Sequence, residues 1–348
     1  MTAAEPCQPG TAWIDVHHHA YHPLLVRELR RHGITRLGAH APMPDWNVRD
    51  SVEAMDRAGV TAAILSVILP DAVFSLPAGP TRRLFRLANE LSARLVECNP
   101  GRFGALAAIP LGDPPGALAE VAYAFDVLGL DGAVLPAVPA DGSQLGDPLH
   151  APVFDELDRR KAAVFIHPRA SAGTCAGPNA RRAQIAPPAC LESVFSTTRA
   201  VVSLLYSGTL GRCPDIEFIV AHAGGVLPYL ADRAEPTPEF TEADRAAARA
   251  DPRSALSTLN YEVTRSVAPA MLRCLRELAG GRRVLFGTGY PAGGDEAMGA
   301  AVEEVRAWVY GLGGQEAVTA VAGCNASRLF PRLASALRLP AVEEVHAW

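Results

Sequence analysis

Four histidines stand at the ends of apolar segments of this chain. His17 and His19 close the segment "WIDVHHH", His167 closes "AVFIHP", and His222 lies in "FIVAHAGG". Neutral imidazole is the commonest metal ligand in proteins, and two histidines two residues apart on an extended strand point to the same face. We therefore expect His17 and His19 to share one ion, with His18 pointing away. A solvated run or a tag remnant is the alternative for three consecutive histidines.

The apolar segments that carry these histidines belong to a regular series of predicted strands. Segments buried on both faces of a parallel sheet read as continuous apolar runs. Eight such strands are predicted near residues 13–17, 62–67, 103–110, 132–135, 162–167, 217–222, 259–263 and 283–288. Segments with helical periodicity lie between them, at 50–58, 81–98, 116–128, 151–160, 193–210 and 268–279.

This alternation of strand and helix predicts a (β/α)8 barrel. We expect one domain over residues 1–348, with the barrel core at about 13–331. In such a barrel the carboxyl ends of all strands open onto one face, where active sites are built. Histidines that are hundreds of residues apart in the sequence can then meet at one point. Taken singly, His167 or His222 could instead be a core or rim residue.

Two long connections interrupt the alternation, and both follow a strand that ends in histidine. They are the predicted insertions after strands one and five, at residues 20–49 and 169–190. Loops at this face of a barrel commonly shape the binding pocket, so we expect them to be substrate walls, with plain surface insertions as the alternative. The segment 234–257 is expected to be an exposed helical excursion.

The composition excludes several classes of protein. Of 348 residues, 49% are hydrophobic and 20% charged, and 32 basic against 37 acidic side chains give a net charge of -5. That balance does not favour a nucleic-acid partner. Seven scattered cysteines, the lack of signal-peptide features and the lack of a long apolar run predict a cytoplasmic protein with reduced thiols and no membrane partner.

Several motifs together resemble the amidohydrolase-related decarboxylases, the group of aminocarboxymuconate semialdehyde decarboxylase and 6-methylsalicylate decarboxylase. They are "IDVHHH", "GRFGALAAIPL", "VFIHP", "TTRAVVSLLYSGTLGRCPDIEF", "FIVAHAGGVLPYLADR" and "LFGTGYP", in order from about residue 13 to 331. The resemblance implies that His17, His19 and His167 bind a divalent metal, usually zinc. It also implies that His222 is the catalytic acid and base beside the metal.

One position departs from this family. The resemblance implies a metal-binding aspartate after the eighth strand, and this chain has Gly289 there, in "GTGYP". Loss of a carboxylate should weaken metal binding, although three histidines and a water still make a workable zinc site. Glu192 and Asp295 are candidate replacements, with surface acids as the alternative. An engineered substitution would also explain Gly289.

Three further residues are candidates for substrate binding. Arg169 follows His167 by two residues and could hold a substrate carboxylate with a bidentate guanidinium, unless it is a solvent-facing loop residue. Trp46 and Tyr290 could stack on an aromatic ring, although Trp46 could equally anchor the packing of its loop.

The expected function is a metal-dependent, non-oxidative decarboxylase of a small aromatic or unsaturated carboxylic acid. The loss of the aspartate leaves two alternatives open. One is a barrel with altered chemistry, such as a metal-free cyclase, hydratase or isomerase, or a hydrolase, acting on a pathway intermediate. The other is a catalytically silent homologue. A homodimer is possible.

Overall fold

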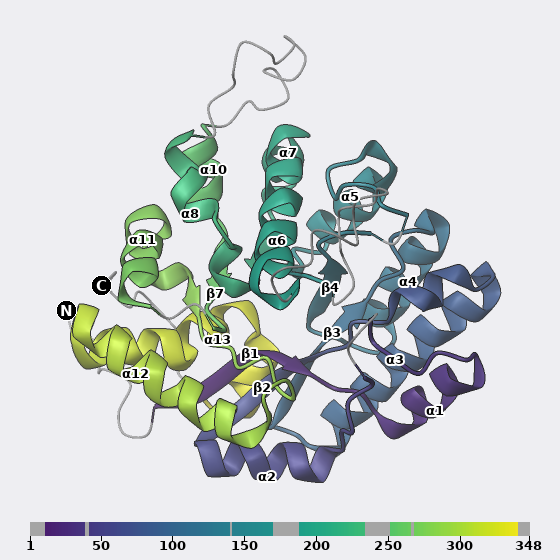
Figure 1. The fold of residues 1–348 in the computed structure, drawn as a ribbon, viewed down its shortest axis with the longest axis horizontal. Helices are drawn as coiled ribbons and strands as arrows, with labels where there is room; N and C mark the ends of the chain where they lie inside the picture. The colour runs from purple at the N-terminus through teal and green to yellow at the C-terminus, as the bar shows by residue number, and fades with distance from the viewer. Residues whose placement is uncertain are drawn as a thin grey trace.

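Eight parallel strands form one sheet in which the strand order follows the sequence, as predicted. The computed structural model describes residues 11–38, 42–139, 141–169, 188–233, 251–265 and 268–339. Figure 1 shows the strands at the centre with helices around them. The strands are β1 (Trp13–His19), β2 (Val60–Ser66), β3 (Phe103–Ala108), β4 (Gly132–Pro136), β5 (Ala163–His167), β6 (Glu217–Val220), β7 (Asn260–Glu262) and β8 (Val284–Leu285).

The sheet closes into a barrel between β1 and the segment that follows β8. β8 itself is short, but the chain beyond it remains hydrogen bonded to β1. The amide of Gly289 donates to the carbonyl of His17 at 2.8 Å, and the amide of His19 donates to the carbonyl of Tyr290 at 2.7 Å. Gly289 is therefore held directly beside the histidine-bearing end of β1.

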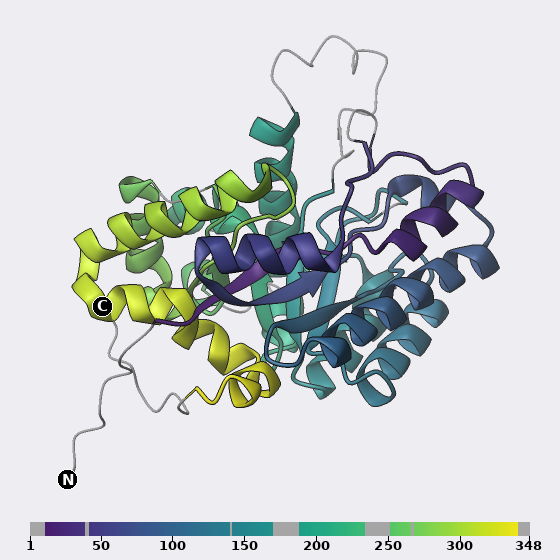
Figure 2. The same ribbon diagram turned by 90° about the horizontal axis from the view of Figure 1, so that it is seen from below.

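Helices cover the outside of the barrel and follow the predicted alternation (Figure 1). The helix α2 (Val48–Ala58) lies along the β1–β2 side of the barrel (Figure 2). The other α-helices are α1 (Pro23–Arg31), α3 (Ala78–Cys98), α4 (Pro114–Asp126), α5 (Ala151–Arg159), α6 (Pro188–Tyr206), α7 (Thr209–Arg212), α8 (Leu227–Leu230), α10 (Pro252–Ser257), α11 (Pro269–Ala279), α12 (Gly294–Thr319), α13 (Asn325–Leu329) and α14 (Pro331–Ala336).

The structure describes most of the predicted insertion at 20–49 and little of the other two predicted excursions. The insertion at 20–49 is not all loop, because α1 forms within it: proline occupies its first turn and the side chain of His22 accepts a hydrogen bond from the amide of Leu24. Most of the insertion at 169–190 and of the segment 234–257 lies outside the described residues. Within the latter, Pro252–Ser257 is the helix α10.

Short single-turn elements also occur in the part of the chain that the structure describes. They are η1 (Asp71–Ser75), η2 (Pro148–His150), η4 (His222–Gly224), η5 (Ala231–Arg233), η6 (Gly281–Arg283) and η7 (Ala320–Cys324). No helix among the described residues is both long and apolar enough to cross a membrane. Four cysteines of the described part of the chain, Cys98, Cys213, Cys274 and Cys324, are free thiols.

Gly132 shows how tightly the barrel wall is packed. A Cβ added there would lie 2.3 Å from the carbonyl oxygen of Ala163 on the neighbouring strand and 2.9 Å from Leu106. We expect Gly132→Ala to lower the free energy of unfolding by about 1–3 kcal/mol in urea titrations, because the adjacent backbone must shift. Gly299→Ala in α12 is the control, since nothing lies within 4 Å of its Cβ. Equal stability of the two variants would contradict this packing.

Candidate metal centre

The structure brings three of the predicted residues together at the carboxyl ends of β1 and β5. The Nε2 atom of His17 lies 3.2 Å from Nε2 of His19 and 2.8 Å from Nε2 of His167. The candidate ligand atoms of the three residues all lie within 4.8 Å of one another. His17 and His19 are buried, and His167 is half-buried. Three imidazole nitrogens thus converge on one point that solvent reaches from one side.

These separations suit a shared divalent ion. Two nitrogens bound to one ion at about 2.0–2.1 Å, at angles between a right angle and the tetrahedral angle, lie about 2.9–3.4 Å apart. The two separations at His17, 2.8 and 3.2 Å, fall at or near this range. The residues present therefore fit a divalent metal.

The hydrogen bond of His17 to a buried carboxylate supports the same conclusion. Its Nδ1 lies 2.8 Å from Oε2 of Glu262, at the end of β7. A ring that donates from Nδ1 to this carboxylate leaves Nε2 directed at the other two imidazoles. A carboxylate behind a metal-binding histidine fixes the ring orientation and strengthens the ligand.

Glu262 is a functional candidate that the sequence reasoning missed. It is fully buried, and it also accepts hydrogen bonds from the backbone amides of Thr264 and His222. Burial alone would raise the pKa of its carboxyl, but the interactions with His17, His222 and Thr264 together hold the pKa below its usual value. Its position near the end of the predicted strand 259–263 was the available signal, because the histidines also lie at strand ends.

We expect Glu262→Gln to weaken metal binding about 10- to 100-fold, because a neutral amide polarises the His17 ring less than a carboxylate does. Competition titration with a chromophoric chelator measures this change. Glu217→Gln is the matched control: Glu217 pairs with Arg283 and Arg328 on the barrel wall and makes none of the contacts at the histidines. Unchanged metal affinity in Glu262→Gln would show that the carboxylate does not support the ligand.

Burial keeps the other two imidazoles neutral. It lowers the pKa of both His19 and His167 well below the usual value, and the neighbouring histidines lower them further. Nδ1 of His19 lies 3.0 Å from the hydroxyl of Ser66 on β2, which orients the ring. Neutral rings are the form that binds a metal, so at pH 7 no proton has to be removed from these two residues.

His18 points to the outside of the barrel, as expected from the strand geometry. Its Nδ1 lies 3.0 Å from Asp15 and its Nε2 2.8 Å from Ser51 on α2. Asp15 in turn accepts hydrogen bonds from the amides of His17 and Thr288, both at 3.0 Å. This buried carboxylate therefore ties the end of β1 to the residue that precedes Gly289.

Gly289 lies beside His17. Its φ of 70° lies in the left-handed region, and a Cβ there would be 4.0 Å from Nε2 of His17. The two candidate replacements for the missing acid do not line the cavity beside the histidines. Glu192 lies 3.7 Å from Arg199 in α6, and Asp295 pairs with Arg57 across the outer helices.

His222 stands next to the cluster but is not part of it. Its ring centre is 5.5 Å from that of His17 and 6.1 Å from that of His167, and its φ of 54° is unusual for a residue with a side chain. Burial lowers its pKa to about 4, with smaller contributions from the neighbouring His17 and Arg265. The buried Nδ1 has no hydrogen-bond partner among the described residues. An unpaired imidazole beside three convergent ones is suited to proton transfer.

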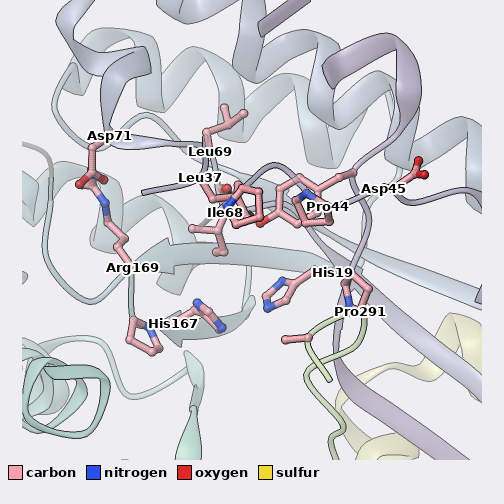
Figure 3. A pocket seen from close by; sticks show the side chains of 14 residues that line it. His19, Leu37, Pro44, Asp45, Ile68, Leu69, Asp71, His167, Arg169 and Pro291 are labelled. Atoms are coloured by element: carbon pink, nitrogen blue, oxygen red, sulfur yellow. Dashed lines mark hydrogen bonds and ion pairs between the residues drawn. The ribbon is translucent and has the colours of Figure 1, made fainter. Parts of the chain in front are cut away.

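A cavity of about 480 Å³ opens beside His19 and His167. Figure 3 shows the two rings facing each other at one end and Arg169 reaching toward Asp71 at the other. The walls between these ends are mainly apolar, and the lining residues are His19, Tyr21, Leu37, Pro42, Pro44, Asp45, Ile68, Leu69, Asp71, His167, Pro168, Arg169, Pro291 and Ala292.

Arg169 is not a solvent-facing loop residue. Only 7% of it is exposed, and burial lowers the pKa of its guanidinium to about 10. One guanidinium nitrogen pairs with Asp71, another donates to the carbonyl of Val138 at 3.0 Å, and the group lies over the ring of Phe74. Asp71 therefore balances the positive charge of Arg169, which was predicted to bind a substrate carboxylate.

Trp46 and Tyr290 are both buried, and neither is among the residues that line this cavity. Tyr290 stacks on the ring of His18 with centres 4.8 Å apart, on the outer side of β1. The indole nitrogen of Trp46 has no hydrogen-bond partner among the described residues. Their predicted stacking on a substrate ring stays a prediction.

A parallel eight-stranded barrel with imidazoles from its first and fifth strands converging at the carboxyl face is a barrel of the amidohydrolase type. The model of the amidohydrolase family, Amidohydro_2, matches residues 14–332, so the chain belongs to this family. It is similar to the 6-methylsalicylic acid decarboxylase of Aspergillus aculeatus, with 31% identity over 92% of this chain and 96% of that protein. The resemblance seen in the sequence motifs is confirmed.

Other relatives agree with this placement. The chain is 36% identical to a decarboxylase of Aspergillus niger over 64% of its length, although the match spans only 61% of that protein. Among solved structures, one titled as an amidohydrolase superposes with a TM-score of 0.77, 26% identity and 92% and 100% coverage. A manganese-bound dihydroxybenzoic acid decarboxylase from Polaromonas sp. JS666 shares the fold, with a TM-score of 0.75, 20% identity and 92% and 97% coverage.

Proposed function

We propose that this protein is a metal-dependent, non-oxidative decarboxylase of a small aromatic carboxylic acid. The observation that carries the proposal is the convergence of His17, His19 and His167 at the end of a mainly apolar cavity of about 480 Å³. A cavity of this size with a few polar groups at one end suits a substituted benzoic acid. The decarboxylase relatives support the same reaction.

The proposed ligands of the metal are Nε2 of His17, His19 and His167. An ion held there would supply a Lewis acid for the substrate's carboxylate. Three imidazoles favour zinc over magnesium or calcium, and we propose zinc as the resident ion. Manganese, which the dihydroxybenzoic acid decarboxylase binds, is the second candidate.

His222 is the proposed proton carrier. Decarboxylation of an aryl acid replaces the carbon–carbon bond to the carboxylate by a carbon–hydrogen bond, so one proton must reach the ring carbon as carbon dioxide leaves. With a pKa of about 4, the imidazole of His222 is neutral at pH 7. It therefore takes up a proton from the substrate's hydroxyl or from water and then delivers this proton to the ring carbon. Burial disfavours the protonated imidazole, which makes it a strong proton donor.

Arg169 is proposed to orient the substrate at the other end of the cavity. Because Asp71 balances the charge of Arg169, the pair offers both a hydrogen-bond donor and an acceptor to a polar substituent of the substrate ring. The substrate carboxylate then binds at the histidine end of the cavity. The apolar walls, with Leu37, Ile68 and Leu69, exclude water from the ring. Trp46 and Tyr290 stay candidates for stacking, and a homodimer stays a prediction.

Carbon dioxide release from a panel of aromatic acids tests the proposal directly. The protein is stripped with a chelator, dialysed, and assayed with and without added zinc or manganese on 6-methylsalicylate, 2,6-dihydroxybenzoate and 5-carboxyvanillate. We expect activity on at least one acid that disappears on stripping and returns with metal. Activity that survives stripping would favour a metal-free reaction, and inactivity on all acids with metal bound would favour a silent homologue.

A further inference from the structure

The space beside Gly289 has the properties of a ligand subsite. We propose that it takes a small carboxylate, from solution at rest or from the substrate in turnover, and that this carboxylate supplies the oxygen ligand that the chain itself lacks. The inference rests on the metal site of the proposed function. It assigns a role to Gly289 and Thr264, which that function does not use.

The first support is geometric. A Cβ built on Gly289 would have two heavy atoms of other described residues within 4 Å: Cγ2 of Thr264 at 3.2 Å and Nε2 of His17 at 4.0 Å. Nε2 of His17 is the atom that also approaches both other imidazoles. A group of a few atoms placed here therefore reaches the point on which the three histidines converge.

The second support is a polar atom without a partner. Thr264 is 4% exposed, and its hydroxyl oxygen is buried with no hydrogen-bond partner among the described residues. A buried hydroxyl without a partner is costly. Cγ2 and the hydroxyl share one carbon, so a single rotamer step brings the hydroxyl to the place where Cγ2 borders the Gly289 space. A carboxylate there would accept its hydrogen bond.

The third support is charge. Within the described residues, the group of convergent ligand atoms consists of three imidazoles and contains no carboxylate. Glu262 is the buried acid next to it, and its oxygens already accept from His17 and from the amide of Thr264. A divalent ion held by neutral ligands in a buried site keeps its full charge, which a low-dielectric environment disfavours. An anion that binds together with the metal removes this penalty.

The test measures metal affinity with formate as the probe. Apoprotein is titrated with zinc at constant ionic strength, with and without millimolar formate, and with cobalt in parallel, because the visible absorption of cobalt reports its ligands. Binding that is coupled in this way is reciprocal. We expect formate to tighten zinc binding about tenfold, within the usual range of such couplings, and to shift the cobalt bands.

Two variants locate the effect. Gly289→Asp carries its own carboxylate in this space, so formate should no longer change its zinc affinity. Thr264→Val keeps the shape but lacks the hydroxyl, so the formate effect should fall severalfold. An undiminished formate effect in Gly289→Asp, or in Thr264→Val, would overturn the assignment of the subsite.

The result also separates this inference from the proposed function. Zinc that binds equally well with and without formate would overturn the subsite and leave the decarboxylase proposal standing. A formate effect in a protein that releases no carbon dioxide would support the subsite and contradict the decarboxylase. No zinc binding under either condition would contradict both.

Discussion

His167→Ala is expected to abolish decarboxylation, with a loss of at least about 10³-fold in kcat/KM. A bound metal stabilises the transition state by several kcal/mol, and about 1.4 kcal/mol corresponds to a tenfold change in rate. His167 is the best of the three ligands to remove. Its Nδ1 has no hydrogen-bond partner among the described residues, whereas removal of His17 would leave the buried carboxylate of Glu262 without its main partner. The variant should therefore fold and lose the metal.

The matched control removes a histidine from outside the site. His32 follows α1 at the surface, and its ring lies 3.9 Å from Glu28. His32→Ala should keep full activity and one equivalent of zinc, as measured by elemental analysis alongside steady-state kinetics. Retention of zinc and activity in His167→Ala would remove this residue from the metal site.

Gly289→Asp is expected to raise the affinity for zinc about 10- to 100-fold, which corresponds to about 1.4–2.7 kcal/mol. The added carboxylate faces Nε2 of His17 and supplies both a ligand and a negative charge. The left-handed φ of 70° opposes this gain, although aspartate tolerates that conformation better than most residues.

Gly289→Asn separates charge from backbone strain, because asparagine has nearly the same size and an equal tolerance of a positive φ. We expect zinc affinity to rise much less in this variant than in Gly289→Asp. If decarboxylation appears in Gly289→Asp and the natural protein is inert, the silent alternative is correct. Lower zinc affinity in Gly289→Asp than in the wild type would contradict the assigned geometry of this position.

The barrel could be predicted from the sequence because most strands are apolar runs between helical segments. Segments such as 163–167 and 217–220 are buried almost throughout and have few polar residues, so their boundaries were close to those observed. The helix α12 was missed because glycine recurs along it and it is kinked at Gly313 and Gly314. A helix that is stabilised mainly by tertiary packing shows only a weak helical pattern in its own sequence.

The site could be predicted only in part, since spacing within a strand is local and contacts between strands are not. The HxH pattern at His17 and His19 fixed which rings share a face. Nothing local linked Glu262 to His17, because their contact joins β7 to β1 across the barrel interior. The same limit applies to Arg169, whose burial depends on Asp71 at the start of η1.

The claim on which the account depends is that His17, His19 and His167 hold one divalent ion. Anomalous diffraction at the zinc edge, from crystals of protein purified with zinc, tests it most directly. The account predicts a single strong peak about 2.0–2.1 Å from Nε2 of all three residues. No peak within bonding distance of these atoms, with zinc bound elsewhere or not at all, would contradict it.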